Sequence, residues 1–192
     1  METTFVGDKR LVLQCDVKNR AQLGSMLAEA LPITVDDLHL TVLHIGPAKS
    51  LYQEVRNVAG TSLERYELEM VSLLRKCIAR SKDEYKAQVT GITVLDSSVQ
   101  SHLVLLVNPS EELCLLRDYC RRHFMLFLEH CGIKSPELFA AQSRSISQHA
   151  PEWLPHITIG AGVRSVPAVK GLGEINLGRL YVRRSHKSQG VC

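Results

Sequence analysis

Long apolar runs are missing from this chain. None of its 192 residues belongs to a stretch approaching the roughly 18–20 apolar residues of a membrane-spanning helix. The first eight residues, METTFVGD, also lack the basic-then-apolar pattern of a secretory signal. We therefore expect a protein without membrane association that works in the cytoplasm.

The cysteines form no C-x-x-C pair of the kind that binds metals or exchanges disulfides. A disulfide framework is not expected in a chain of this length that has no secretory signal. Reduced thiols agree with an intracellular location. Five of the six cysteines lie in apolar-periodic segments, as small hydrophobic side chains do: Cys15, Cys77, Cys114, Cys120 and Cys131.

A strong charge of either sign is also missing. The formal net charge is +3 and the pI is about 8.5, with 45% hydrophobic and 22% charged residues. These values are ordinary for a globular protein and fall short of the positive field of a dedicated nucleic-acid binder. They are compatible with a phosphate-bearing ligand.

Apolar periodicity and turn residues predict alternating strands and helices. We expect strands at 10–17, 38–45, 86–95, 102–108, around 156–159 and at 175–183. We expect helices from about 19 to 31, at 50–58, from a capping box at Thr61-Ser62-Leu63-Glu64 to about 77, at 110–131 and at 136–141.

The order strand–helix–histidine strand occurs twice, over 11–45 and over 103–159. This repeat predicts an α+β fold with two pseudo-symmetric lobes, each a small, mostly antiparallel sheet with outer helices. The active-site cleft would lie between the lobes. We expect a single domain over 1–184, with lobes of roughly 1–100 and 101–184 that can exchange strands, and a flexible tail over 185–192.

Two short segments carry the chemistry, His39-Leu40-Thr41-Val42 and His156-Ile157-Thr158-Ile159. The two histidines lie 117 positions apart. Because residues i and i+2 of a strand point to the same face, each segment presents an imidazole beside a hydroxyl. The repeat predicts one site with a histidine from each half of the chain.

Such a site suits the cleavage of a phosphodiester. One group must take a proton from the nucleophile while another gives a proton to the leaving oxygen, and histidine titrates in the range that serves both. We expect His39 and His156 to be catalytic. Thr41 and Thr158 would bind the phosphate through its non-bridging oxygens. This chemistry requires no cofactor and no metal ion.

The segments His39-Leu40-Thr41-Val42-Leu43-His44-Ile45-Gly46 and Leu154-Pro155-His156-Ile157-Thr158-Ile159-Gly160 resemble the paired H-x-T/S-x motifs of the two-histidine (2H) phosphoesterase superfamily. The resemblance implies a LigT-like or 2′,5′-phosphodiesterase-like bilobal fold and a metal-independent hydrolase. By analogy with that family, His156 would be the base for an attacking water and His39 the acid. The arginine common after the second motif has Arg164 as its counterpart.

Four further residues are candidates for substrate binding. Trp153 could stack a base or instead fill the junction between the lobes. Tyr181 and Arg183 alternate on one face of the last strand, and Arg164 could neutralise phosphate, although ordinary strand or loop roles remain open for all three. Strict alternation places His44 on the core side with Leu40 and Val42, which indicates a structural role.

The resemblance implies a nucleotide or RNA-end substrate with a 2′-linked or cyclic phosphodiester: a 2′-5′ oligoadenylate, a cyclic dinucleotide such as cGAMP, or a 2′,3′-cyclic phosphate. Acting on the first two, the protein would antagonise nucleotide-signalled immunity. Two alternatives stay open, a non-catalytic RNA- or nucleotide-binding module of the same fold and an unrelated α+β domain. The sequence indicates no obligate protein partner and does not give the oligomeric state.

Overall fold

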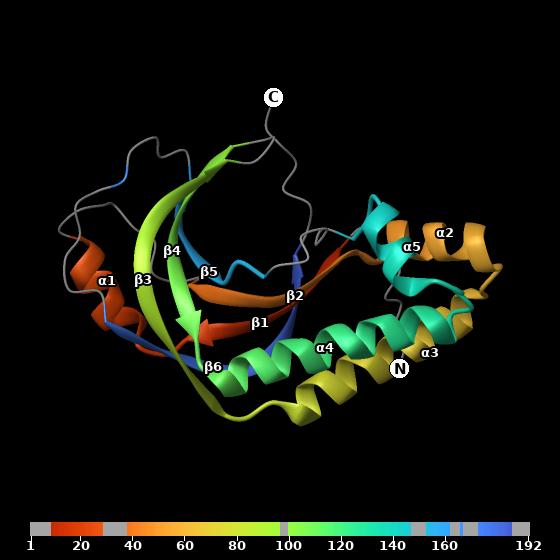
Figure 1. The fold of residues 1–192 in the computed structure, drawn as a ribbon, viewed down its shortest axis with the longest axis horizontal. Coiled ribbons are helices and arrows are strands. Elements are labelled where there is room, and N and C mark those ends of the chain that lie inside the picture. The colour runs from red at the N-terminus through yellow and green to blue at the C-terminus, as the bar shows by residue number, and fades with distance from the viewer. Residues whose placement is uncertain are drawn as a thin grey trace.

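The computed structural model describes residues 9–28, 38–96, 100–146, 153–161, 166 and 173–185. Within these ranges the chain forms six strands and five helices (Figure 1). In chain order they are β1 (Arg10–Val17), α1 (Arg20–Ala28), β2 (His39–Pro47), α2 (Ala48–Ala59), α3 (Leu63–Arg80), β3 (Glu84–Asp96), β4 (Ser101–Pro109), α4 (Glu111–His130), α5 (Pro136–Gln142), β5 (His156–Ala161) and β6 (Glu174–Ser185).

All six strands pair antiparallel, in the closed order β1-β2-β5-β4-β3-β6. The expected α+β fold, with antiparallel strands, outer helices and a repeated order of elements, is confirmed. The first copy of the repeat is β1–α1–β2, and the second runs from β4 through α4 to β5. The two histidine strands, β2 and β5, are direct neighbours where the copies meet.

Four strand pairings, including that of β2 with β5, cross between the predicted lobes. The hairpin of β3 and β4 spans the boundary expected near residue 100, and β6 pairs with both β1 and β3. The lobe boundaries themselves stay a prediction. Of the predicted tail, Ser185 belongs to β6, and 186–192 lies outside the described residues.

Helices α3 and α4 run side by side along one face of the curved sheet (Figure 1). Cys15 of β1 lies on this face, close to Cys120 of α4. The pKa of the Cys120 thiol is raised by its hydrogen bond with Cys77, by burial and by the neighbouring thiols of Cys77 and Cys15. The core between sheet and helices includes Leu13, Leu40, Tyr66 and many other buried side chains. We call the opposite side of the sheet, which carries Gln14, the inner face. Because side chains alternate along a strand, the apolar residues of β1 and β2 fix which polar residues reach the inner face.

Helix α3 begins one residue later than its capping box predicts. The hydroxyl of Ser62 accepts the backbone N–H of Arg65 at 3.2 Å, which makes Ser62 the N-cap. Thr61 instead donates its hydroxyl to the backbone carbonyl of Cys131, next to the end of α4. Thr61 therefore ties two helix ends together, and the capping prediction of Thr61 was wrong by one position.

Among the described residues, no helix is long and apolar enough to cross a membrane.

Candidate active site

The pairing of β2 with β5 brings the two H-x-T segments together. Leu40 is opposite Ile157, and both side chains are fully buried on the helix-covered side. Continuing the antiparallel register by one position on either side of this pair sets His39 against Thr158 and Thr41 against His156. The four polar side chains form a two-by-two block on the inner face.

Within this block the histidines occupy one diagonal and the threonines the other. Diagonal neighbours of an antiparallel pair lie about 7–8 Å apart, within reach of side chains as long as histidine. His39, Thr41 and His156 are half-buried, whereas Thr158 is exposed. The block is therefore accessible from solvent and has its two imidazoles on one diagonal.

The backbone ahead of His156 is fixed on both sides. The indole N–H of Trp153 donates to the carbonyl of Thr41 at 3.3 Å, and the N–H of Val107 donates to the carbonyl of Pro155 at 3.1 Å. Nδ1 of His156 lies 2.9 Å from the carbonyl oxygen of Leu154. Because a carbonyl only accepts, Nδ1 carries the proton. In the neutral ring, Nε2 then has the free electron pair.

A hydrogen-bonded chain lies beside the block on the inner face. Gln14 is opposite Thr41 on one side and Tyr181 on the other. Its amide nitrogen donates to the hydroxyl of Tyr181, and that hydroxyl donates to Oδ1 of Asp16 at 2.5 Å. The second carboxylate oxygen of Asp16 accepts from Arg20 at 2.9 Å.

This chain fixes the protonation of Tyr181 and the orientation of Gln14. Burial, followed by the bond to Asp16, raises the pKa of Tyr181 to about 12, so its hydroxyl is a donor at neutral pH. Since that proton goes to Asp16, Gln14 must offer its nitrogen and not its oxygen to Tyr181. The oxygen Oε1 of Gln14 is buried and has no hydrogen-bond partner.

His44 lies on the inner face, contrary to the sequence prediction. A register shift between Leu13 and Gln14 interrupts the β1–β2 ladder, so that Leu13 is opposite Leu43 and Gln14 is opposite Thr41. Val42 and Leu43 are both buried, and the alternation reverses after them. His44 is opposite Val12, which is in turn opposite Arg183 of β6. The prediction that His44 shares a face with Leu40 and Val42 was therefore wrong.

His44 predicts a dependence of stability on pH. Burial, followed by the nearby Arg10 guanidinium, lowers the pKa of His44 below its ordinary value, and its Nδ1 is buried without a partner. As pH falls through the ordinary histidine range, the unfolded chain takes up a proton that folded His44 resists. We expect the free energy of unfolding to have its full value above about pH 6.5 and to decrease as the pH falls below it.

Urea unfolding at about pH 7.5 and pH 5 measures this dependence. The decrease should be smaller in a His44→Gln variant, because the glutamine does not titrate. An equal decrease in the variant and in the unsubstituted protein would contradict the assignment to His44.

Of the four candidate substrate-binding residues, the three that the structure describes lie in two different parts of the fold. Tyr181 and Arg183 are on the inner face, in register with Gln14 and Val12. Trp153 is half-buried against the core, with the Arg117 guanidinium of α4 5.3 Å from its ring centre. These contacts place Trp153 at the junction of β2, β5 and α4. Arg164 lies outside the described residues.

Sequence reasoning did not select Gln14 or Asp16. They are the polar positions of an alternating strand whose other face is Leu13, Cys15 and Val17, and this pattern places both on one face without distinguishing them from solvated side chains. Among the described residues, no group of three or more His, Cys, Asp and Glu side chains is arranged to hold a metal ion.

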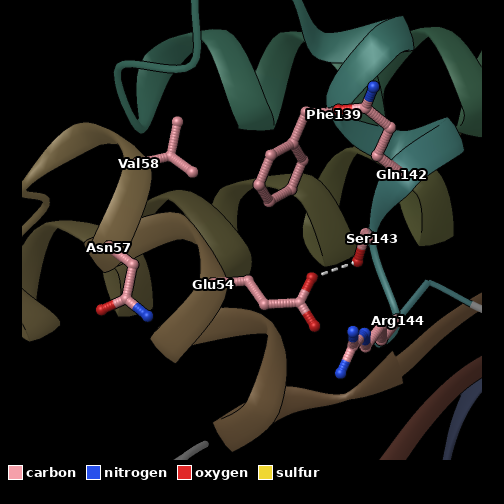
Figure 2. Close-up of a pocket in the computed structure, with 7 residues that line it drawn as sticks. All are labelled: Glu54, Asn57, Val58, Phe139, Gln142, Ser143 and Arg144. Carbon is pink, nitrogen blue, oxygen red and sulfur yellow. Dashed lines mark hydrogen bonds between the residues drawn. The ribbon is translucent and has the colours of Figure 1, made fainter.

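A hollow of about 320 Å³ lies between α2 and α5 and contains none of the predicted site residues (Figure 2). Glu54 of α2 points toward Ser143, with hydroxyl-to-carboxylate distances of 2.5 Å to Ser143 and 2.6 Å to Ser145. These bonds fasten the segment that follows α5 onto α2. The lining residues are Glu54, Asn57, Val58, Phe139, Gln142, Ser143 and Arg144.

Comparison with solved structures defines the class of fold. The chain has a LigT-like fold. It is similar to Escherichia coli LigT crystallised with ATP, with 16% identity, a TM-score of 0.52 and coverage of 95% of this chain and 91% of LigT. It is also similar to the protein TT0787 of Thermus thermophilus, with 16% identity, a TM-score of 0.51 and coverage of 90% of this chain and 83% of that protein.

Comparisons of sequence add no relative to these structures. No model of a protein family matches the chain, and neither does the sequence of any curated protein. At 16% identity the structural similarity establishes the fold, and the chemistry has to be argued from the residues of this chain.

Proposed function

We propose that the protein is a 2H-type phosphodiesterase in which His39 and His156 act as general acid and general base on one phosphorus atom. The observation that carries the proposal is the pairing of Leu40 with Ile157, which puts both H-x-T segments on adjacent strands with their polar residues on one accessible face. Two imidazoles on one diagonal provide the two proton carriers that the reaction needs. The mechanism needs no metal ion.

His156 is the base in this proposal. Its Nδ1–H is engaged by the carbonyl of Leu154, so the neutral ring offers a free electron pair at Nε2 for the proton of the nucleophile. His39 then supplies the proton to the leaving oxygen. For a 2′,3′-cyclic phosphate the nucleophile is water, whereas for a 2′–5′ linkage the adjacent 3′-hydroxyl attacks and leaves a cyclic product.

Thr41 and Thr158 bind the non-bridging oxygens of the phosphate. They lie on the other diagonal of the block, so each hydroxyl is beside one histidine along its strand and opposite the other across the pair. Hydrogen bonds at this place become stronger as negative charge develops on the phosphate.

Replacing either threonine by valine removes the hydroxyl and keeps the branched shape. We expect kcat to fall about 10- to 100-fold in Thr41→Val and in Thr158→Val, by analogy with the loss of one oxyanion donor. The Thr→Ser variants should recover most of the rate, because serine restores the donor. Equal losses in the valine and serine variants would show that the methyl group and not the hydroxyl matters.

The proposed substrates are small nucleotides or RNA ends with a 2′-linked or cyclic phosphodiester, and the proposal includes a cytoplasmic site of action. Two features support a nucleotide. LigT, which shares the fold, was crystallised with ATP, and the inner face of this chain carries Tyr181 and Arg183 beside the block. An aromatic ring can stack on a base and a guanidinium can pair with phosphate. Cleavage of 2′-5′ oligoadenylates or cyclic dinucleotides would antagonise nucleotide-signalled immunity.

A turnover assay with three substrates tests the function. The protein is incubated, with a chelator present, with a 2′,3′-cyclic nucleotide, a 2′–5′ adenylate trimer and a mixed-linkage cyclic dinucleotide, and the products are separated by chromatography. We expect turnover of at least one. Binding of a substrate without turnover would favour a nucleotide-binding module of the same fold over an enzyme. The absence of both binding and turnover with all three substrates would refute the proposal.

A further inference from the structure

Asp16 is the acidic residue opposite His39 in the β1–β2 ladder. Residues directly opposite in an antiparallel pair have Cβ atoms about 4.5–5.5 Å apart and share a face of the sheet. Asp16 belongs to the inner face, because its neighbours Cys15 and Val17 are buried in the core. The carboxylate therefore lies on the same surface as His39 and one strand away from it.

The carboxylate of Asp16 is held by two other groups. Oδ1 accepts the hydroxyl of Tyr181 from β6, and Oδ2 accepts Arg20 from the start of α1. Each oxygen of a carboxylate has two acceptor positions, so these two bonds leave an acceptor position on each oxygen for a further donor. Tyr181 is itself held by Gln14, and this fixes the side-chain conformation of Asp16 from the far side of β1.

We infer that Asp16 is a positioning residue for His39: it accepts an N–H of the His39 ring and so fixes the tautomer and the ring orientation. A carboxylate that binds one imidazole nitrogen determines which nitrogen carries the proton and which faces the substrate. The backbone carbonyl of Leu154 does the corresponding work for His156. The two histidines would thus be oriented by different kinds of acceptor. The catalytic consequence rests on the proposed function, whereas the pairing itself does not.

Nuclear magnetic resonance of the histidine rings tests the pairing without any substrate. Two-bond ¹⁵N–¹H spectra at about pH 8.5, where an ordinary histidine is neutral, report the proton on each ring nitrogen. The His39 and His156 signals are assigned with His39→Gln and His156→Gln. We expect Asp16→Asn to change the tautomer ratio of His39 and to leave that of His156 unchanged.

Two further variants make the test specific. Glu129→Gln removes an exposed carboxylate from α4, on the helix-covered side, and should change neither ring. Tyr181→Phe removes the donor to Oδ1 of Asp16 and should shift the His39 ratio in the same direction as Asp16→Asn, by a smaller amount. It also keeps the test open should Asp16→Asn not fold. Unchanged His39 signals in the folded variants would overturn the pairing.

Kinetics then separate this inference from the proposed function. We expect Asp16→Asn to lower kcat about tenfold with KM within about twofold, since orientation and not substrate binding is lost. If the His39 signals shift but the unsubstituted protein cleaves none of the three substrates, the function fails and the pairing stands. If the protein is active and the His39 signals do not respond, the function stands and the role of Asp16 is refuted.

Discussion

Replacing either His39 or His156 by alanine is expected to lower kcat by about 10²- to 10⁴-fold, the usual contribution of a positioned acid or base. The two residues act in a single proton exchange at one phosphorus. The double variant should therefore be hardly slower than the slower single variant, because the loss of one partner already disables the pair. Initial rates on the substrate identified by the three-substrate assay measure all three variants.

A histidine outside the inner face provides the control. His130 is exposed at the end of α4, where it pairs with Glu69 of α3 at 2.9 Å. His130→Ala should keep the rate of the unsubstituted protein. Single variants that retain more than a tenth of the rate, or losses that multiply in the double variant, would contradict a joint role of His39 and His156.

Gly46→Ala is expected to destabilise the fold by about 3 kcal/mol or more, which is a large effect for a single substitution. Gly46 has a φ of 101°, a conformation that side-chain-bearing residues rarely adopt. A Cβ at this position would lie 1.9 Å from the backbone oxygen of Ser145. The segment that Glu54 holds through Ser143 and Ser145 would have to move away from β2.

Alanine variants of two other glycines distinguish the cost of an unfavourable backbone conformation from the cost of a steric collision. Gly60 also has a positive φ, of 67°, but a Cβ there would contact nothing within 4 Å, so Gly60→Ala should cost about 1–2 kcal/mol. Gly91 has open space and no such conformation, and Gly91→Ala should change stability by less than about 0.5 kcal/mol. Urea unfolding of the three variants measures their relative loss of stability, which should be largest for Gly46→Ala and smallest for Gly91→Ala. A Gly46→Ala variant as stable as Gly91→Ala would show that the approach of Ser145 to β2 is not tight.

The helices and strands with regular periodicity could be predicted from the sequence. The strand predicted over 10–17 coincides with β1, and the helix predicted over 110–131 agrees with α4 to within a residue at each end. In such segments each residue's preference agrees with the burial of a continuous face. The repeated order of elements also follows from local patterns, and the structure contains it.

The register of the strands could not be predicted in the same way. The bulge at Val42 and Leu43 forms because both of these apolar side chains are buried in the core. Whether both can be buried depends on the neighbouring β1 and not on the sequence of β2 alone. Strict alternation for that reason put His44 on the wrong face. The adjacency of β2 and β5 likewise comes from long-range pairing, and the motifs only suggested it.

The residues that support the candidate site, Asp16 and Gln14, could not be predicted from the sequence either. Asp16 and Gln14 are ordinary residues for the exposed face of a strand, and nothing local distinguishes them from solvated side chains. Their importance arises from Tyr181 and Arg20, which come from β6 and α1. A contact between residues 165 positions apart in the chain is visible only once the sheet is closed.

The division of labour between the histidines is the central claim, and a change of leaving group tests it most directly. A nucleoside p-nitrophenyl phosphodiester releases a phenolate that needs no proton, so it bypasses the general acid but not the base. The account predicts that His39→Ala cleaves this substrate at nearly the rate of the unsubstituted protein while His156→Ala stays inactive. Rescue of both variants, or of neither, would contradict an acid and a base that act on the same phosphorus.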